Sequence, residues 1–303
     1  MPGLNSRLRG AMASNSTTRE RTRIEPKIDK GTLSAADSLR LHWPEYLMEA
    51  GQLALYLFFV CTFVIVLQHP ASPIRQMVGS ALLRHAIMGL AMGTITIVIL
   101  LTPLGKQSGG HFNPAITLAY YRLGKVEPWD AVLYIAAQVI GAISGTAIAG
   151  YVLGSAVHNE AVQCAVTAPG RFGATAAFLA ELAISFILML TILFATNAKT
   201  MGRYTPYFVG LLLAMYYAFE SPLSGMSTNP ARSFGSAFHA GYWHALWVYL
   251  IAPVLGMLLA AEAFLRARGG RGPYCAKLNH DNNTRCIFNH GAVIVGDAPQ
   301  SHV

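Results

Sequence analysis

The sequence predicts an all-α membrane protein in which six transmembrane helices and two re-entrant half-helices form an inverted repeat. The first observation is composition: 53% of the 303 residues are hydrophobic and 12% are charged, whereas a soluble domain carries about 25% charged residues. The second is a series of six apolar segments, each able to cross roughly 30 Å of hydrocarbon as a helix. The third is a tripeptide, Asn-Pro-Ala, that occurs in both halves of the chain.

The predicted spans divide the chain into a tail, a membrane domain and a second tail. Residues 1–43 are polar and basic without an apolar run, so we expect a flexible N-terminal tail. Residues 44–268 form the membrane domain, with half-repeats of about 45–155 and 174–268, and residues 269–303 form the C-terminal tail. The spans are Tyr46–Leu67, Arg84–Leu104, Trp129–Leu153, Ala176–Thr196, Tyr207–Phe219 extended slightly upstream, and Trp243–Leu265.

Each half contains three spans, with the tripeptide between its second and third. Because three is an odd number, the second half must enter the membrane from the opposite side, which produces an inverted repeat. Proline suits the first turn of a helix and asparagine its cap, so each copy should open a short helix. These helices are too short to cross the membrane, and we expect their N-termini to meet near its midplane. The two copies are Asn113-Pro114-Ala115 and Asn229-Pro230-Ala231.

The meeting point of the two half-helices has a defined chemistry. Asn113 and Asn229 can each offer side-chain N–H donors there. A water molecule that accepts from both turns its hydrogens away from its neighbours along the pore, which breaks the hydrogen-bonded wire needed for proton hopping. The positive ends of two helix dipoles also raise the free energy of any cation at this point.

Together with Arg232, which directly follows the second copy, the two boxes resemble those of the aquaporin (major intrinsic protein) family over roughly residues 45–268. The resemblance implies a channel for water and other small neutral solutes that excludes protons and ions. It also implies a homotetramer with one pore per subunit, embedded in the lipid of a cell membrane, plasma or inner. Neither a cofactor nor a nucleic acid partner is expected.

Two other functions stay open at this point. A glycerol or small-solute facilitator belongs to the same family, and by resemblance Ser233 follows the water pattern whereas Tyr249 and Leu250 are closer to the glycerol pattern. A secondary transporter also uses inverted repeats and broken helices, although it should carry ionisable residues at a binding site. The sequence contains no nucleophile–base pair or cofactor fingerprint, so we do not expect an enzyme.

Arg232 is the strongest candidate for a selectivity residue. An arginine at membrane depth should line water or a pairing site, because facing lipid is costly. Pairing with Glu220 is the structural alternative. The resemblance implies an outer constriction that contains Arg232 together with Tyr217, Met226 and, from the second span, Met92 or Gly93.

Glu49 and Glu181 are carboxylates at matching positions in the first span of each half. Intramembrane acids are candidates for proton carriers. The alternative is that each accepts hydrogen bonds from a re-entrant loop, and the matching positions and the resemblance favour this role. His111, two residues before Asn113, is expected to brace the loop or line the pore.

Basic residues predict the orientation. Eighteen of the twenty-two Lys and Arg residues fall in the two tails and in loops on one side, whereas Arg75, Arg84, Arg171 and Arg232 fall on the other. Positive residues stay inside, so both termini should be cytoplasmic. The net charge of +8 therefore reflects topology rather than nucleic-acid binding.

The C-terminal tail contains two cysteines and two histidines in the pattern C-x4-H-x5-C-x3-H. These residue types are zinc ligands, and cytoplasmic thiols suit a metal better than a fixed disulfide. The spacing is not that of a common zinc finger, so a tail without metal is the expectation and a zinc site the weaker candidate. Its ligands would be Cys275, His280, Cys286 and His290.

Overall fold

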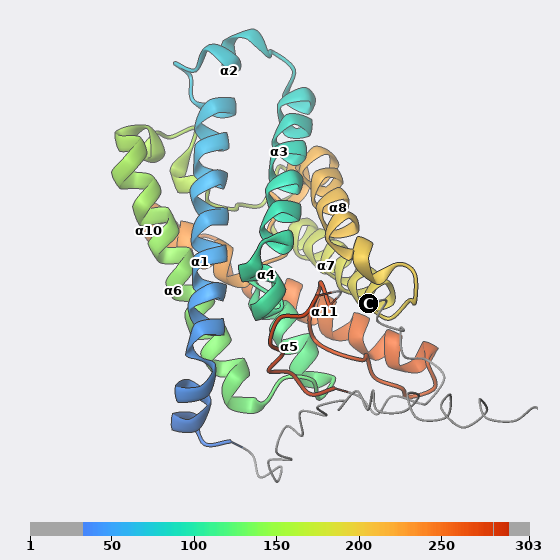
Figure 1. The fold of residues 1–303 in the computed structure, drawn as a ribbon. Coiled ribbons are helices and arrows are strands. Elements are labelled where there is room, and N and C mark those ends of the chain that lie inside the picture. Colours follow the sequence, from blue (N-terminus) through green and yellow to red (C-terminus); the bar gives the residue numbers. More distant parts are fainter. Residues whose placement is uncertain (1–32, 281, 291–303) are drawn as a thin grey trace, which may run out of the picture. The chain divides into compact units, whose positions relative to one another are not determined.

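The computed structural model describes residues 33–280 and 282–290, and within these residues all of the regular structure is helical (Figure 1). The long helices are α1 (Ala35–Gln68), α3 (Ala81–Leu101), α6 (Pro128–Leu153), α7 (Gly173–Thr196), α8 (Thr205–Phe219) and α11 (Leu246–Ala267). The short α-helices are α2 (Pro73–Met77), α4 (Pro103–Ser108), α5 (Pro114–Arg122), α9 (Ser221–Ser224) and α10 (Pro230–Ala240). Three 3-10 turns join them: Gly154–His158, Gln163–Ala165 and Gly202–Tyr204.

The helices pack as two related halves. In the first half α1 packs along α6, and in the second α7 packs along α11, while α3 and α8 pack against each other across the two halves. The short helices α5 and α10 both contact α6 and α11. The predicted inverted repeat of long helices with two half-helices is therefore confirmed as the fold class.

Glycines allow the closest of these helix crossings. A Cβ atom on Gly141 of α6 would lie 2.2 Å from the backbone oxygen of Ala50 in α1. In the second half, a Cβ atom on Gly256 of α11 would lie 2.4 Å from the backbone oxygen of Leu182 in α7. Small residues permit such backbone contact between helices in lipid, where packing rather than the hydrophobic effect drives association.

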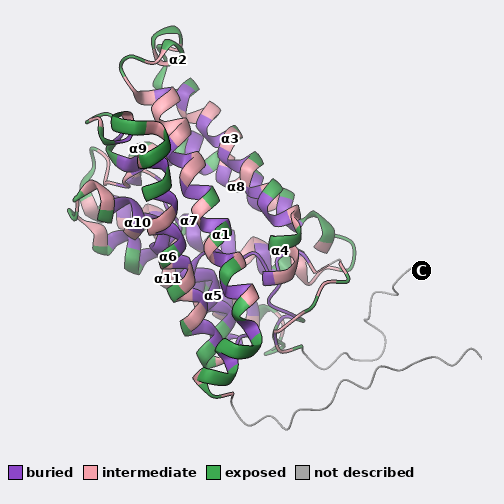
Figure 2. Ribbon diagram, turned by 60° about the vertical axis from the view of Figure 1, so that its left-hand side comes forward, coloured by how far each residue is buried: buried purple, intermediate pink, exposed green. Residues whose placement is uncertain are grey.

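The outer surface of this bundle is apolar. Large hydrophobic side chains such as Leu90, Ile140, Leu179 and Leu211 are more than half exposed, and buried positions lie on the inward sides of the long helices (Figure 2). Among the described residues, five helices are long and apolar enough to span a membrane. The chain is a multi-pass membrane protein.

The largest difference from the predicted boundaries is the start of α1. α8 lies where its span was predicted, but its 15 residues make about 22 Å of helix, which is shorter than a full span. α1 begins at Ala35, so residues 35–43 are helical rather than part of a flexible tail. Polar contacts hold this extension, since His42 Nδ1 lies 2.8 Å from Asp130 Oδ1 and Ser34 caps the first turn. The helix therefore begins before the apolar run that was used to predict its start. Residues 1–32, 281 and 291–303 lie outside the described part.

Candidate functional site

The two Asn-Pro-Ala boxes each begin a half-helix. Asn113 is the N-cap of α5, and its side-chain oxygen accepts from the Ala115 N–H at 2.9 Å. Asn229 is the N-cap of α10, and its side-chain oxygen accepts from the Arg232 N–H at 3.2 Å. Capping uses the amide oxygen and leaves the amide N–H groups to point away from the helix.

The two asparagines then bind each other's loops. Asn113 Nδ2 donates to the Thr228 carbonyl at 2.8 Å, and Asn229 Nδ2 donates to the Phe112 carbonyl, also at 2.8 Å. Phe112 and Thr228 both have positive φ, 28° and 55°, a strained conformation for non-glycine residues. This reciprocal pair of bonds joins the two half-helices at their N-termini and uses one N–H of each amide.

A cavity of about 30 Å³ lies between the half-helices. This volume holds about one or two water molecules. Both asparagines line it, so a molecule in the cavity can accept a hydrogen bond from their remaining N–H groups. The other lining residues are Tyr56, Thr96, Gly110, His111, Phe112, Ile116, Leu188, Val209, Leu213, Ser227, Thr228 and Leu278. A larger cavity of about 200 Å³, beside His158 and Tyr242, contains neither asparagine.

Glu49 is fully buried and anchors the first re-entrant loop. Its carboxylate accepts from the Ser108 hydroxyl at 2.7 Å and from the N–H groups of His111 and Phe112 at 3.1 and 2.6 Å. Gln138 of α6 donates to it as well, at 2.7 Å. Charge-assisted bonds of this kind are the strong ones, so the loop is held firmly to α1.

Glu181 repeats this arrangement in the second half. It accepts from the Ser224 hydroxyl and from the N–H groups of Ser227 and Thr228, all at 2.7 Å. Tyr249 of α11 then donates to the Ser224 carbonyl. In the first half a tyrosine of α6, Tyr134, likewise donates to the Ser108 carbonyl. Ser-Gly precedes both boxes in the sequence, as Ser108-Gly109 and Ser224-Gly225, but this pattern predicted neither the bonds of the serines to the acids nor those of the tyrosines.

Arg232 lies in α10 and is 3% exposed. Its Nε and Nη1 atoms have no hydrogen-bond partner among the described residues, and neither has either carboxylate oxygen of Glu220. The pairing of Arg232 with Glu220 is therefore not present. Buried polar groups are normally paired, so both side chains need water or another polar partner.

The other predicted constriction residues are buried side chains from different elements. The Tyr217 hydroxyl of α8 lies 3.2 Å from that of Tyr56 in α1. Met226 precedes α10 with a positive φ of 56°, and Met92 is fully buried one turn before Thr96, which lines the cavity. A Cβ atom on the alternative residue Gly93 would lie 2.4 Å from the backbone oxygen of Gly210 in α8, so that position faces a helix. Nothing in the sequence pattern pointed to Tyr56.

His111 connects the cavity with the C-terminal tail. Its Nε2–H donates to the Ala276 carbonyl at 2.8 Å, and its Nδ1 lies 3.1 Å from the Thr117 hydroxyl. The ring stacks between Tyr120 and Phe288, with centroid distances of 5.2 and 5.3 Å. Two of these partners come from the tail, so the tail packs directly against the first re-entrant loop.

The structure also brings together the four tail residues of the weaker zinc candidate. The possible ligand atoms of Cys275, His280, Cys286 and His290 all lie within 4.8 Å of one another. The hydrogen bond between the two thiols, 3.4 Å long, raises the pKa of Cys275 and lowers the pKa of Cys286. The spacing C-x4-H-x5-C-x3-H alone did not predict that these four side chains lie together, because their approach depends on the fold of the tail.

Comparison with known proteins gives consistent matches. The family model described as Major intrinsic protein matches residues 37–264. Aquaporin NIP3-1 of Oryza sativa subsp. japonica is 34% identical over 223 residues, which cover 71% of this chain and 69% of that protein. Glycerol uptake facilitator protein-like 6 of Lactiplantibacillus plantarum is 37% identical over 178 residues, 57% of this chain and 81% of that protein.

One solved structure extends the likeness to three dimensions. The X-ray structure of the aquaglyceroporin from Plasmodium falciparum superposes with a TM-score of 0.63, covering 74% of this chain and 95% of that one. The sequence identity is 22%, so this likeness concerns the fold.

Proposed function

Because the chain belongs to the major intrinsic protein family, a family of passive channels rather than enzymes, we propose that it conducts water and other small neutral solutes while excluding protons and ions. The observation that carries this proposal is the reciprocal bond between each asparagine and the opposite loop. It fixes both half-helix N-termini at one cavity of water size.

Exclusion of protons follows from the donors at that cavity. Each asparagine keeps one amide N–H for a passing molecule, after the other has bonded the opposite carbonyl. A water that accepts from these donors directs its own hydrogens elsewhere, and the two dipole ends disfavour hydronium. Neutral solutes meet no such penalty.

The constriction is the second selective element. Arg232 brings a fixed charge that disfavours cations and donors that replace part of the hydration of a passing solute. Tyr217 and Met226 supply bulk beside it, and we include Met92 from α3. Tyr56 joins this set in our proposal because its hydroxyl pairs with that of Tyr217.

A glycerol or small-solute facilitator is the second candidate, and the likeness to a protein named as a glycerol uptake facilitator supports it. Ser233 and Tyr249, which matched the water and the glycerol pattern respectively, do not decide between the two solutes, because both have structural roles here. The Ser233 hydroxyl lies 2.7 Å from that of Thr167 and 2.6 Å from that of Ser227. Ser233 therefore braces the second re-entrant loop, as does Tyr249.

A coupled transporter is disfavoured by the state of the two acids. Glu49 and Glu181 are completely buried and bonded to loop N–H and hydroxyl groups. A carboxylate that carries protons would have to release those donors at each cycle. We propose that both acids, together with His111, support the re-entrant loops.

The assembly and orientation are also part of the proposal. The exposed apolar surface suits lipid and neighbouring subunits, and the family resemblance favours a homotetramer with one pore per subunit. The basic bias favours cytoplasmic termini in a plasma or inner cell membrane.

Stopped-flow light scattering on proteoliposomes tests the proposal. Vesicles that contain the protein, measured with and without a membrane-permeant metal chelator, should shrink faster than protein-free vesicles in an impermeant osmolyte in at least one of the two conditions. The same vesicles in a glycerol gradient rank the two solutes. Equal rates with and without protein in both conditions, for both water and glycerol, would overturn the proposal.

A further inference from the structure

The four tail residues have the arrangement of a zinc site. The cluster joins two thiols and two imidazoles, the donor set of many structural zinc sites. A tetrahedral ion with Zn–S bonds of about 2.3 Å and Zn–N bonds of about 2.0–2.1 Å separates its ligand atoms by roughly 3.3–3.8 Å. The two sulfur atoms lie 3.4 Å apart, and all four ligand atoms lie within 4.8 Å of one another. Small side-chain rotations are enough to close the shell.

A ring nitrogen of one cluster residue is buried without a protein partner. His280 Nε2 makes no hydrogen bond to any described residue, although buried polar atoms are normally paired. The two cysteines are not joined in a disulfide. A shared ion would satisfy the imidazole and both sulfurs at once.

The surroundings of the cluster hold the histidines in place. The Tyr274 ring stacks on His290 at 5.3 Å and meets the edge of His280 at 5.2 Å. Lys277 is buried, and its ammonium donates to the Thr284 and Arg285 carbonyls at 3.3 and 2.7 Å. These contacts order the loop between the ligands, as the outer shell of a metal site does.

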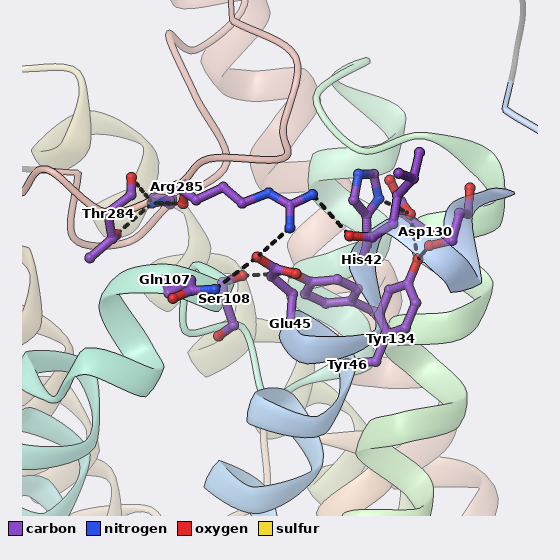
Figure 3. Close-up of polar contacts among 12 residues, drawn as sticks. His42, Glu45, Tyr46, Gln107, Ser108, Asp130, Tyr134, Thr284 and Arg285 are labelled. Carbon is purple, nitrogen blue, oxygen red and sulfur yellow. Dashed lines mark hydrogen bonds and ion pairs between the residues drawn. The ribbon is translucent and has the colours of Figure 1, made fainter.

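The segment around the cluster, residues 274–280 and 282–290, is bonded to the end of the bundle; we name it the C-terminal segment. The Leu278 N–H donates to the Gly109 carbonyl at 3.0 Å, and the Asn289 N–H donates to the Lys125 carbonyl at 3.0 Å. The Arg285 guanidinium donates to the Leu41 carbonyl at 2.9 Å, near Glu45 (Figure 3). Figure 1 shows the segment beside α4 and α5, in agreement with these bonds.

Two apolar side chains of the C-terminal segment lie at the cavity or on the re-entrant loop beside it. Leu278 is 1% exposed and lines the same cavity as Asn113 and Asn229. Phe288 covers Gly109 so closely that a Cβ atom there would lie 2.7 Å from its ring. The cavity is therefore capped at this end by tail residues.

We propose that Cys275, His280, Cys286 and His290 bind one zinc ion. The C-terminal segment, held by this ion, closes the pore at the end where Leu278 and Phe288 lie. The metal site stands on its own geometry, whereas the closure rests on the proposed function. Without the ion, the loop that carries Leu278 and Phe288 loses the cross-link between its four ligands, and we expect it to leave the end of the pore.

Metal content tests the site in the full-length protein. Elemental analysis should find about one zinc per chain, and cobalt exchanged into the site should give the thiolate charge-transfer and ligand-field bands of a tetrahedral ion. Both should be lost in a Cys275→Ser/Cys286→Ser variant and kept in the control His244→Ala, which alters an exposed histidine outside the cluster. No bound zinc and no cobalt spectrum in the wild-type protein would overturn the site.

Water permeability tests the closure. A membrane-permeant chelator should raise the permeability of wild-type proteoliposomes severalfold, and zinc should restore the low value. Phe288→Ala should keep its zinc and be more permeable before chelation. Permeability that is above that of protein-free vesicles but equal with and without zinc, in protein that binds the ion, would overturn the closure alone. Permeability no higher than that of protein-free vesicles both with and without zinc, in protein shown to bind the ion, would overturn the proposed function and leave the metal site intact.

Discussion

Replacing Glu49 by glutamine removes an acceptor that the first re-entrant loop needs. The new amide oxygen can take the place of Oε1, which accepts from Ser108 and His111. The new amide nitrogen then faces the Phe112 N–H and the Gln138 amide. Gln138 can rotate and present its own oxygen, which has no partner among the described residues. The Phe112 N–H is fixed in the backbone and is left without an acceptor.

One buried N–H without an acceptor costs about 1–3 kcal/mol. For a chain of roughly this size, each kcal/mol lowers the unfolding midpoint by about 2–4 °C. Glu181→Gln should cost about the same, because the Thr228 N–H is left without an acceptor there. Circular dichroism of the purified protein in detergent measures both midpoints.

The matched control is Glu160→Gln, the same change at an exposed site, which should leave the midpoint within experimental error. If Glu49→Gln and Glu181→Gln have the same unfolding midpoint as this control, the carboxylates do not hold the loops. Glu49 and Glu181 would then not support the loops, and proton transfer would be the alternative role for these acids.

Other changes probe the constriction, the packing and the topology. Arg232→Val removes the charge of the constriction, so proton and cation leak across vesicles should rise while water still passes; an unchanged leak would mean that Arg232 does not line the pore. Met226→Gly should admit more glycerol without a proton leak, because the central asparagines are untouched; an unchanged glycerol rate would remove this residue from the constriction. Gly141→Ala forces a methyl group against the α1 backbone and should cost about 1–3 kcal/mol, whereas Gly150→Ala, whose nearest contact is 3.7 Å, should lower the unfolding midpoint less. Tags on both chain ends should be protected from protease in intact cells, and digestion of either would reject the orientation.

The fold class could be predicted because its signals are local or repeated. Apolar segments of spanning length and two copies of Asn-Pro-Ala fix the number and order of the helices, and the matching acids Glu49 and Glu181 follow from the repeat. The start of α1 could not be predicted, because its first turns depend on Asp130, which lies far along the chain.

Other parts of the candidate site depend on tertiary contacts. Tyr56 enters it through a hydroxyl on another helix, Tyr217. The Cys and His residues of the tail become a cluster only when the loop folds around Lys277. Contact between Ala276 and His111 joins positions that no sequence pattern links.

The central claim is that one pore passes water and stops protons, and both fluxes can be measured in the same vesicles. Proteoliposomes loaded with a pH-sensitive dye would receive an osmotic step and then a pH step, with and without chelator. We predict that, with chelator, water permeability exceeds that of protein-free vesicles, while proton flux equals that of protein-free vesicles with and without chelator. Proton flux that rises in parallel with water permeability, or water flux that requires a pH gradient, would contradict the account.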